Sequence, residues 1–181
     1  MSSTADPTVP GRSCGECTLC CKVMGIVALD KPMGQWCRHC GDHGCTIYTD
    51  RPSDCRIFYC GFLTTAALGE EWRPSKSKII LVYELNGDRI AAYVDPQRPD
   101  AWKREPYYST LKHWSRQTVP KRCQVIVANG RHIIAVLPDR EVDLGMVGPD
   151  DVIITQERRS PSGTVTVETL KLHKSDPRLA R

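Results

Sequence analysis

The sequence lacks the long apolar runs, leader features and phosphate-binding loops that mark several common functional classes. Its longest apolar runs, such as IILVY, reach only five residues, whereas a membrane-spanning helix needs about 20. The N-terminal stretch has neither the basic nor the apolar segment of a signal peptide, so we predict a cytoplasmic protein without a membrane partner. No GxGxxG pattern or phosphate loop occurs, so the sequence indicates no nucleotide or S-adenosylmethionine site.

A clustered basic surface is missing as well. The formal charge is +4 at pH 7, and the excess of basic residues is spread over the chain after residue 65. Nucleic-acid binding calls for a concentrated basic face, so we do not expect a nucleic-acid partner. The mixed aromatic and basic stretch at 102–108 resembles a single-strand binder but is better explained by a helix that packs against a sheet.

Cysteine, by contrast, is abundant and unevenly placed. Of the 10 cysteines, all but Cys123 lie between residues 14 and 60. A secreted disulfide scaffold is the ordinary explanation of such density. The odd number in the cluster and the predicted cytoplasmic location, where thiols stay reduced, argue against it. CxxC spacing in a cytosolic chain indicates metal binding instead.

The cluster contains three CxxC steps, in which a two-residue spacer lets both sulfurs face one ion. Thiolates are soft ligands that select zinc, iron–sulfur clusters or copper(I). We predict zinc or iron, the latter as an iron–sulfur cluster, without a choice between them. His39 and His43 lie in the same zone and are weaker candidates, because enough sulfurs are available. The predicted metal ligands are Cys14, Cys17, Cys20, Cys21, Cys37, Cys40, Cys45, Cys55 and Cys60.

Cys20 and Cys21 are direct neighbours in the stretch CGECTLCC. Adjacent side chains point about 100° apart on a helix and to opposite faces of a strand. Both thiolates therefore do not easily reach one ion, and we predict that they serve different sites or that one supports the other. The pattern also differs from the bacterial ferredoxin run, whose last cysteine comes four residues later.

The stretch GCTIYTDRPSDCRIFYC predicts a short helix that carries Cys55. Asp50 is placed to cap this helix, and Pro52 and Asp54 suit its first turn. Cys60 is expected at or just past the end of the same helix, before a glycine.

Two arginines, Arg51 and Arg56, lie close in sequence to these ligands. Four thiolates around a zinc ion leave a net charge of about −2, which nearby guanidinium groups would offset. The alternative, that both arginines are ordinary surface residues, is equally open at this point.

The chain divides into three predicted zones: a flexible tail at 1–13, a cysteine-cluster metal-binding module at 14–65 and a small α+β domain at 75–181. The module has little apolar surface to bury, so something other than a hydrophobic core must hold it. The predicted fold class is α+β. It consists of an irregular, metal-stabilised N-terminal module followed by an antiparallel β-hairpin sheet with one helix.

Two asparagine–glycine turns, at 86–87 and 129–130, predict hairpins. A third strand pair is expected at 151–158 and 163–172, around the turn-like SPSG, and a helix is expected from about residue 107, with proline in its first turn. Pairing outward from the first turn predicts one core-facing set, which consists of Ile79, Leu81, Tyr83, Leu85, Ile90, Ala92 and Val94.

Cys123 and His132 together suggest a nucleophile and its base. Pairing outward from the turn at 129–130 places His132 opposite Val127, two cross-strand rows from a direct partnership with Cys123. Cys123 is better explained as a small buried apolar residue.

The segments CGECTLCC, WCRHC, GCTIY and DRPSDCRIFYC together resemble the CxxCxxCC cysteine-cluster family, described as a zinc- or iron-chelating domain. The resemblance covers residues 14–62 and leaves Cys40 outside the family pattern. Eight ligands of this kind suit two four-cysteine sites, or one cluster with a supporting site. A related group, the flagellin lysine methylases, uses an iron–sulfur cluster, which favours iron by analogy. The resemblance implies metal ligation by Cys14, Cys17, Cys20, Cys21, Cys37, Cys45, Cys55 and Cys60.

Three functional hypotheses follow from these patterns. The first is a cytoplasmic metal-binding protein that holds zinc or an iron–sulfur cluster for metal handling, redox sensing or delivery to a protein partner. The second is an iron–sulfur enzyme that modifies a protein side chain. The third is a structural zinc module beside a β domain that binds a protein partner.

Overall fold

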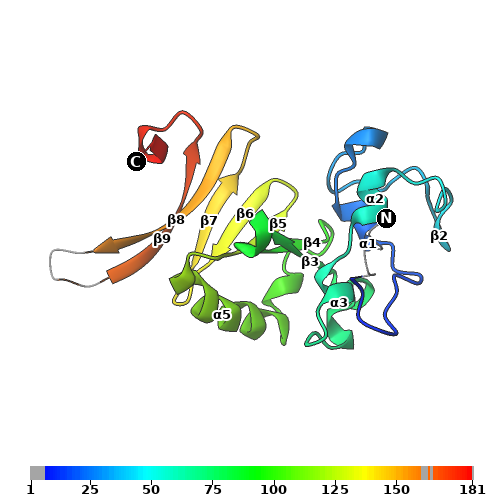
Figure 1. The fold of residues 1–181 in the computed structure, drawn as a ribbon, viewed down its shortest axis with the longest axis horizontal. Helices are drawn as coiled ribbons and strands as arrows, with labels where there is room; N and C mark the ends of the chain where they lie inside the picture. The colour runs from blue at the N-terminus through cyan, green and yellow to red at the C-terminus, as the bar shows by residue number, and fades with distance from the viewer. Residues whose placement is uncertain (1–6, 160–162, 164, 181) are drawn as a thin grey trace, which may run out of the picture.

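The computed structural model describes residues 7–159, 163 and 165–180. Within them a cysteine module (residues 7–65) lies beside a sheet domain (residues 74–159 with 163 and 165–180), as Figure 1 shows. The module contains short elements only: α1 Leu19–Val23, η1 Val27–Leu29, β1 Cys40–Gly41, β2 Gly44–Cys45, α2 Ser53–Ile57 and α3 Gly61–Thr64. Two further short helices, η2 Glu70–Trp72 and α4 Pro74–Ser77, lead into the sheet.

The sheet domain holds a five-stranded sheet in the order β3-β4-β5-β6-β7 and a separate two-stranded ladder, β8-β9. Helix α5 runs beneath the sheet, and β8 and β9 lie at the end of the molecule away from the cysteine module (Figure 1). The strands are β3 Ile79–Glu84, β4 Arg89–Val94, β5 Gln124–Asn129, β6 His132–Val136, β7 Glu141–Met146, β8 Asp151–Arg159 and β9 Val165–His173. The remaining helices are η3 Leu85–Gly87, η4 Ala101–Lys103, α5 Tyr107–Thr118, η5 Val119–Lys121 and η6 Pro177–Ala180.

Helices and strands are both present, so the α+β class is confirmed at this level, but a single antiparallel hairpin sheet is wrong. Strands β4 and β5 pair in parallel, and the ladder β8-β9 is a sheet of its own. The parallel pair arises because η4, α5 and η5 separate the two strands, and a crossover of this length returns the chain in its original direction.

The first hairpin confirms the predicted register, with Ile79 opposite Val94 and Tyr83 opposite Ile90. Its core-facing set is shorter than predicted, because the ladder ends at the pair Glu84 and Arg89. Leu85 belongs to the turn and is 57% exposed, and Tyr83 at the end of the ladder is 42% exposed. The other predicted members of this face are buried.

The register predicted for the second hairpin is wrong by two residues. Asn129 pairs with His132, and Val127 pairs with Ile134. The turn is centred on Gly130 and Arg131, because Gly130 takes up the left-handed conformation at its first position with φ +58°. The predicted third strand pair is confirmed by β8 and β9, and most of the turn that joins them lies outside the described residues.

The core lies on both faces of the sheet. On one face, Leu111 of α5 is fully buried against strand residues that include Val127, which confirms the predicted helix at 107. Two elements cover parts of the other face. Ile153 of β8 packs near Ile126, and α1 of the cysteine module packs on Ile80 of β3. Among the described residues, no helix is long and apolar enough to span a membrane.

Candidate metal centre

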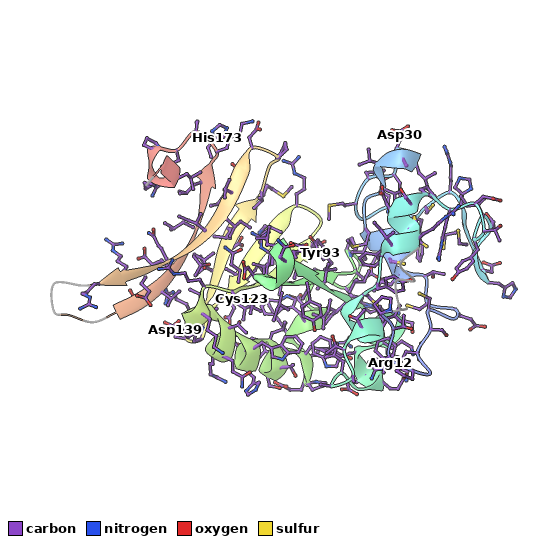
Figure 2. The ribbon with its side chains drawn as sticks, in the orientation of Figure 1. Arg12, Asp30, Tyr93, Cys123, Asp139 and His173 are labelled. Carbon is purple, nitrogen blue, oxygen red and sulfur yellow. The ribbon has the colours of Figure 1, made fainter. Side chains whose placement is uncertain are left out.

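A cavity of about 460 Å³ lies inside the cysteine module and reaches the sheet domain at Ile80. We call it the cysteine cavity. All ten cysteines of the chain are free thiols, and eight of those predicted as ligands border this cavity: Cys14, Cys17, Cys20, Cys21, Cys37, Cys45, Cys55 and Cys60. Figure 2 shows the module that carries these sulfur atoms on the side of the molecule opposite the β8-β9 ladder.

The stretch CGECTLCC forms a tight turn followed by helix α1. The Cys17 amide donates to the Cys14 carbonyl at 2.9 Å, and the Cys21 amide donates to the Thr18 carbonyl at 2.9 Å. Cys20 and Cys21 both lie in α1, where adjacent side chains diverge by about 100°. Both nevertheless border the cysteine cavity, so the helix presents two neighbouring thiols to it.

The next two cavity thiols come from the loop that carries β1 and β2. The Cys37 amide donates to the Cys21 carbonyl at 2.9 Å, so this loop is fastened to the end of α1. The two-residue strands then pair Cys40 with Cys45. Their turn includes Gly44, whose φ of +116° favours glycine.

Cys55 rides on the short helix α2, as predicted, but Asp50 does not cap this helix. The N-cap residue is Pro52, and the Asp50 amide instead donates to the Ile47 carbonyl at 2.9 Å. Cys60 does not end α2 but serves as the N-cap residue of the next helix, α3. The chain leaves the helical conformation at Phe58, so two short helices stand where one was predicted.

Cys40 is the one predicted ligand that does not border the cysteine cavity. Its thiol donates to the Gly41 carbonyl at 3.9 Å. The two predicted histidine alternatives, His39 and His43, do border the cavity. His39 accepts a hydrogen bond at Nε2 from Arg38 Nε at 3.1 Å, and His43 is exposed.

Cys123 lies in the sheet domain, far from the module in Figure 2. It packs partly buried against the main core, and its thiol donates to the Gly87 carbonyl at 3.5 Å. His132 Nε2 lies 2.7 Å from Asp143 Oδ1 on the neighbouring strand. The structure therefore supports the predicted packing role of Cys123 rather than a nucleophile–base pair.

The cysteine cavity supplies the donor type that a soft metal requires, because thiolates bind zinc and iron–sulfur clusters. Its thiols are not drawn together into a finished ligand set. Across residues 7–159, 163 and 165–180, no group of three or more histidine, cysteine, aspartate or glutamate side chains is arranged to hold a metal ion. The donor chemistry fits a metal, whereas ligation would require the thiols to converge.

Lys31 is the buried cation of the cysteine cavity, and the sequence analysis missed it. Its side chain is 7% exposed and borders the cavity, and Nζ donates to the carbonyls of Lys22, Met24 and Pro32. Within the described residues it has no carboxylate partner. Burial lowers the pKa of Lys31, and the thiols of Cys37 and Cys21 act in the opposite direction. A lone lysine before a proline gives no sequence signal of such a position.

Lys22, the neighbouring buried lysine, has an ordinary counter-ion. Its Nζ lies 2.6 Å from Asp95 Oδ1 and 2.9 Å from Gln97 Oε1. This pair links α1 of the cysteine module to the loop after β4. An isolated buried ammonium is costly, and Lys31 in this position has carbonyl acceptors in place of a carboxylate.

Of the two predicted arginines, only Arg51 borders the cysteine cavity. Its guanidinium stacks on the Tyr48 ring at 4.0 Å from the centroid. Arg56 instead donates to the carbonyls of Arg51 and Thr49, at 2.7 and 3.1 Å. Arg56 thus supports the loop, and Arg51 is the one placed to offset negative charge.

A third cation at the cavity, Arg73, comes from outside the predicted module. Glu70 holds its guanidinium in a two-pronged ion pair with both N···O distances at 2.9 Å. The guanidinium also lies over the Phe62 ring, 4.7 Å from its centroid. Arg73 is therefore fixed in position before any ligand binds.

Arg12 fastens the segment before Cys14 to helix α3 (Figure 2). Its guanidinium donates to the carbonyls of Phe62, Thr65 and Leu68. It also stacks on the Phe62 ring from 4.6 Å. The start of the CGECTLCC turn is thus tied to the body of the protein.

Several cavity thiols favour their protonated form. Burial raises the pKa of Cys14, Cys55 and Cys60, and a hydrogen bond with Cys20 raises that of Cys21. Thiolate, the ligating form, must therefore be generated as a metal binds, with release of protons.

Compared with models of known families, with curated proteins and with solved structures, the chain matches none. The resemblance of its cysteine motifs to the CxxCxxCC family therefore stays a prediction.

Proposed function

We propose that the protein binds zinc or an iron–sulfur cluster through the thiolates of the cysteine cavity. One observation carries the proposal: eight cysteines, contributed by the CGECTLCC stretch, the β1–β2 loop and the helices α2 and α3, border a single cavity. These are separate segments of residues 14–60, and a soft thiophilic metal gives a common reason for their meeting.

The charges around the cavity support this proposal. A metal centre with four thiolates carries net negative charge of about −2, which nearby cations would offset. Lys31 is buried at the cavity without a carboxylate partner in the described residues, and Arg51 and Arg73 also border it. Each is positioned by other contacts, so the positive surroundings exist in the absence of a ligand.

The module's own residues would hold the group by losing thiol protons and turning toward it. Zinc bound there would cross-link the four segments, whereas an iron–sulfur cluster would add one-electron chemistry. Because metal binding and folding are coupled in modules with little apolar core, the module is expected to gain order when the metal binds.

We place this activity in the cytoplasm, where free thiols persist, and assign it to metal handling or redox work with a protein partner.

Anaerobic purification followed by metal and sulfide analysis tests the proposal. We expect zinc bound to the chain in a colourless protein, or iron with matching acid-labile sulfide in a brown one. The variant Cys123→Ser is the matched control, because this cysteine lies in the sheet domain, and it should retain the metal in full.

A wild-type protein that holds well under one metal equivalent after anaerobic purification, and gains none on addition of zinc or on cluster reconstitution, would contradict the proposal. Equal metal loss in Cys123→Ser and in Cys37→Ser would contradict it too, because the metal would then not depend on the cysteine cavity.

A further inference from the structure

We infer that Cys40 and Cys45 are a site of reversible oxidation, at which the two thiols join in a disulfide. Such a bond takes the Cys45 sulfur away from the donors of the cysteine cavity. The disulfide itself depends on the β1–β2 hairpin alone, whereas its effect on a bound metal rests on the proposed function.

The two cysteines lie directly opposite each other on neighbouring strands. Strands β1 and β2 are antiparallel, and their ladder pairs Cys40 with Cys45 and Gly41 with Gly44. Side chains of directly opposed residues project from the same face of such a ladder. Both thiols therefore lie on one side of the hairpin.

The position of this pair within the ladder brings the two residues close together. The Thr46 amide donates to the His39 carbonyl at 2.8 Å, so a hydrogen-bonded pair lies one step further from the turn. Cys40 and Cys45 thus form a non-hydrogen-bonded pair, in which opposed Cα atoms are about 4.5 Å apart. Disulfides bridge Cα separations of roughly 4.4–6.8 Å, so the bond requires little movement of either strand.

Cys37, which completes a CxxC step with Cys40, is less favourably placed as its partner. The Cys37 sulfur accepts the His39 amide at 3.5 Å, and the Cys37 amide donates to the Cys21 carbonyl at 2.9 Å. These contacts hold Cys37 beside the end of α1, before the first strand begins. Cys45, in contrast, belongs to the same hairpin as Cys40.

The pair is accessible to an oxidant from solvent. Asp42 and His43, which lie between the paired glycines of the hairpin, are both exposed, and the two cysteines are half-buried. Disulfides in cytosolic proteins are usually transient or redox-sensing, and exposed disulfides are the more easily reduced ones. The position therefore favours a reversible bond over a permanent cross-link.

Oxidation of this pair would change the cysteine cavity through a residue that lies outside it. Cys45 borders the cavity, whereas Cys40 does not. The thiolate is the form of cysteine that binds a metal, and a sulfur in a disulfide is no longer a thiolate. The bond would thus remove one of the eight cavity cysteines from the available donors.

The oxidant in this proposal is a small-molecule disulfide of the glutathione type. The thiolate of one cysteine attacks a sulfur of the oxidant, which forms a mixed disulfide and releases one glutathione thiolate. The second cysteine loses its proton, attacks the protein sulfur of the mixed disulfide and releases the other glutathione thiolate. The two released thiolates take up the two protons. Two protein thiols are thereby oxidised to one disulfide, and one small disulfide is reduced to two thiols.

Peptide mapping tests the pairing without any substitution. The full-length protein is purified anaerobically, incubated with oxidised glutathione together with any metal it holds, and alkylated. Trypsin cleaves after Arg38 and the protease Asp-N cleaves before Asp42, so Cys37, Cys40 and Cys45 fall on three different peptides. We expect peptides 39–41 and 42–49 to be joined and to separate on reduction.

Two mapping results would overturn the inference. One is a disulfide that joins Cys40 to Cys37, to Cys21 or to any cysteine other than Cys45. The other is a Cys40 thiol that stays free or carries only glutathione after the incubation.

A matched pair of serine variants connects the disulfide to metal binding, with zinc as the probe metal. Cys40→Ser keeps all eight cavity cysteines but cannot form the bond, whereas Cys45→Ser lacks both the bond and a cavity donor. Loss of a residue that merely supports a metal site typically weakens binding about 10–100-fold. Oxidised glutathione should therefore weaken zinc binding by the wild type more than about 10-fold, and should leave the affinity of Cys40→Ser close to its reduced value.

Competition with a chromogenic chelator measures these affinities, and circular dichroism verifies that both variants keep the sheet domain folded. Failure of this inference and failure of the proposed function give different results. Zinc binding that oxidation weakens equally in the wild type and in Cys40→Ser would overturn the inference and leave the proposed function standing. A reduced wild-type protein that binds no zinc and no iron–sulfur cluster would contradict the proposed function, while the mapping result would still decide whether the disulfide forms.

Discussion

The cysteine module and the sheet domain are held together by different kinds of interaction. The sheet domain buries a continuous apolar core, with Ile79, Leu111 and Val136 fully enclosed. The module contributes only a small apolar cluster around Leu19 and Val23, and this cluster borrows Ile80 from the sheet. Its remaining order comes from backbone turns, buried lysines and arginine contacts with carbonyl groups.

This difference indicates that a bound metal would stabilise the module more than the sheet domain. A segment with little apolar surface to bury gains little from the hydrophobic effect, and small modules of this kind are usually held by disulfides or metals. All ten cysteines are free here, so under the proposed function the metal is the missing cross-link. The sheet domain needs no such help.

Metal removal is expected to have the largest effect and to separate the two regions. Apparent binding free energies of structural zinc reach about 10 kcal/mol in small metal domains. After chelation, amides of the module should therefore lose most of their protection from hydrogen–deuterium exchange, while amides of β3, β4 and β5 keep theirs. Exchange measured by mass spectrometry resolves the two regions within one sample.

A module that stays protected after complete removal of its metal would contradict this expectation. It would show that the turns, lysines and arginines suffice to hold it. Loss of protection in both regions together would instead show that the two regions unfold as a unit.

The ion pair between Lys22 and Asp95 links the two regions. Breaking it is expected to have the next largest effect on stability. Both residues are buried, and the Nζ–Oδ1 distance is 2.6 Å. Asp95→Asn leaves the ammonium without its counter-ion, which costs about 3–5 kcal/mol. Urea unfolding followed by circular dichroism measures the loss, and Asp95→Asn with Lys22→Met should recover much of it.

Acid provides an independent check on this tie. Burial of Asp95 opposes its ionisation, but the hydrogen bonds from Lys22 and Gln97 outweigh burial and lower its pKa below the usual value of 3.8. A carboxyl with a lowered folded-state pKa contributes stability above its unfolded pKa, and this stability is lost as the pH falls through the folded value. The wild type should thus lose this contribution below about pH 4, and Asp95→Asn should lack that part of the pH dependence.

Replacing Lys31 is expected to have the smallest effect of the three and to act on the metal rather than the fold. Residues that surround the ligands of a metal site typically change its affinity about 10–100-fold. Lys31→Met should weaken metal binding by roughly that factor, measured by competition with a chromogenic chelator. Lys31→Arg keeps the charge and should bind close to wild type.

A purely structural role for Lys31 predicts a different result. Lys31→Met would then lower the melting temperature of the metal-free and metal-loaded protein equally. The metal affinity would not change, and the cation would have no part in the centre.

The sequence predicted the elements that depend on local chemistry. The first hairpin has its predicted register and α5 begins at Tyr107, because a turn dipeptide and apolar periodicity are local signals. The second hairpin is shifted because its glycine occupies the first turn position instead of the second. The parallel pairing of β4 and β5 depends on the path of a crossover, which no local pattern encodes.

The candidate site shows the same contrast between features set by local sequence and features set by long-range packing. Cysteine spacing predicted nine metal ligands, and eight of these cysteines border one cavity, since CxxC steps are short-range. The buried position of Lys31 and the arrival of Arg73 at the cavity were not predictable, because both depend on how distant segments pack. The Asp50 cap failed for a local reason, since Pro52 took the N-cap position.

Strand β3 packs against both regions. Ile79 and Leu81 face the main core, whereas Ile80 faces α1. Separating the two regions between residues 65 and 75 would expose Ile80 to solvent. It would also remove the sheet surface against which the module packs. The composition of the chain predicts a domain border there, but in the structure the module packs directly against the sheet. Each part alone would therefore expose apolar surface that the other part covers.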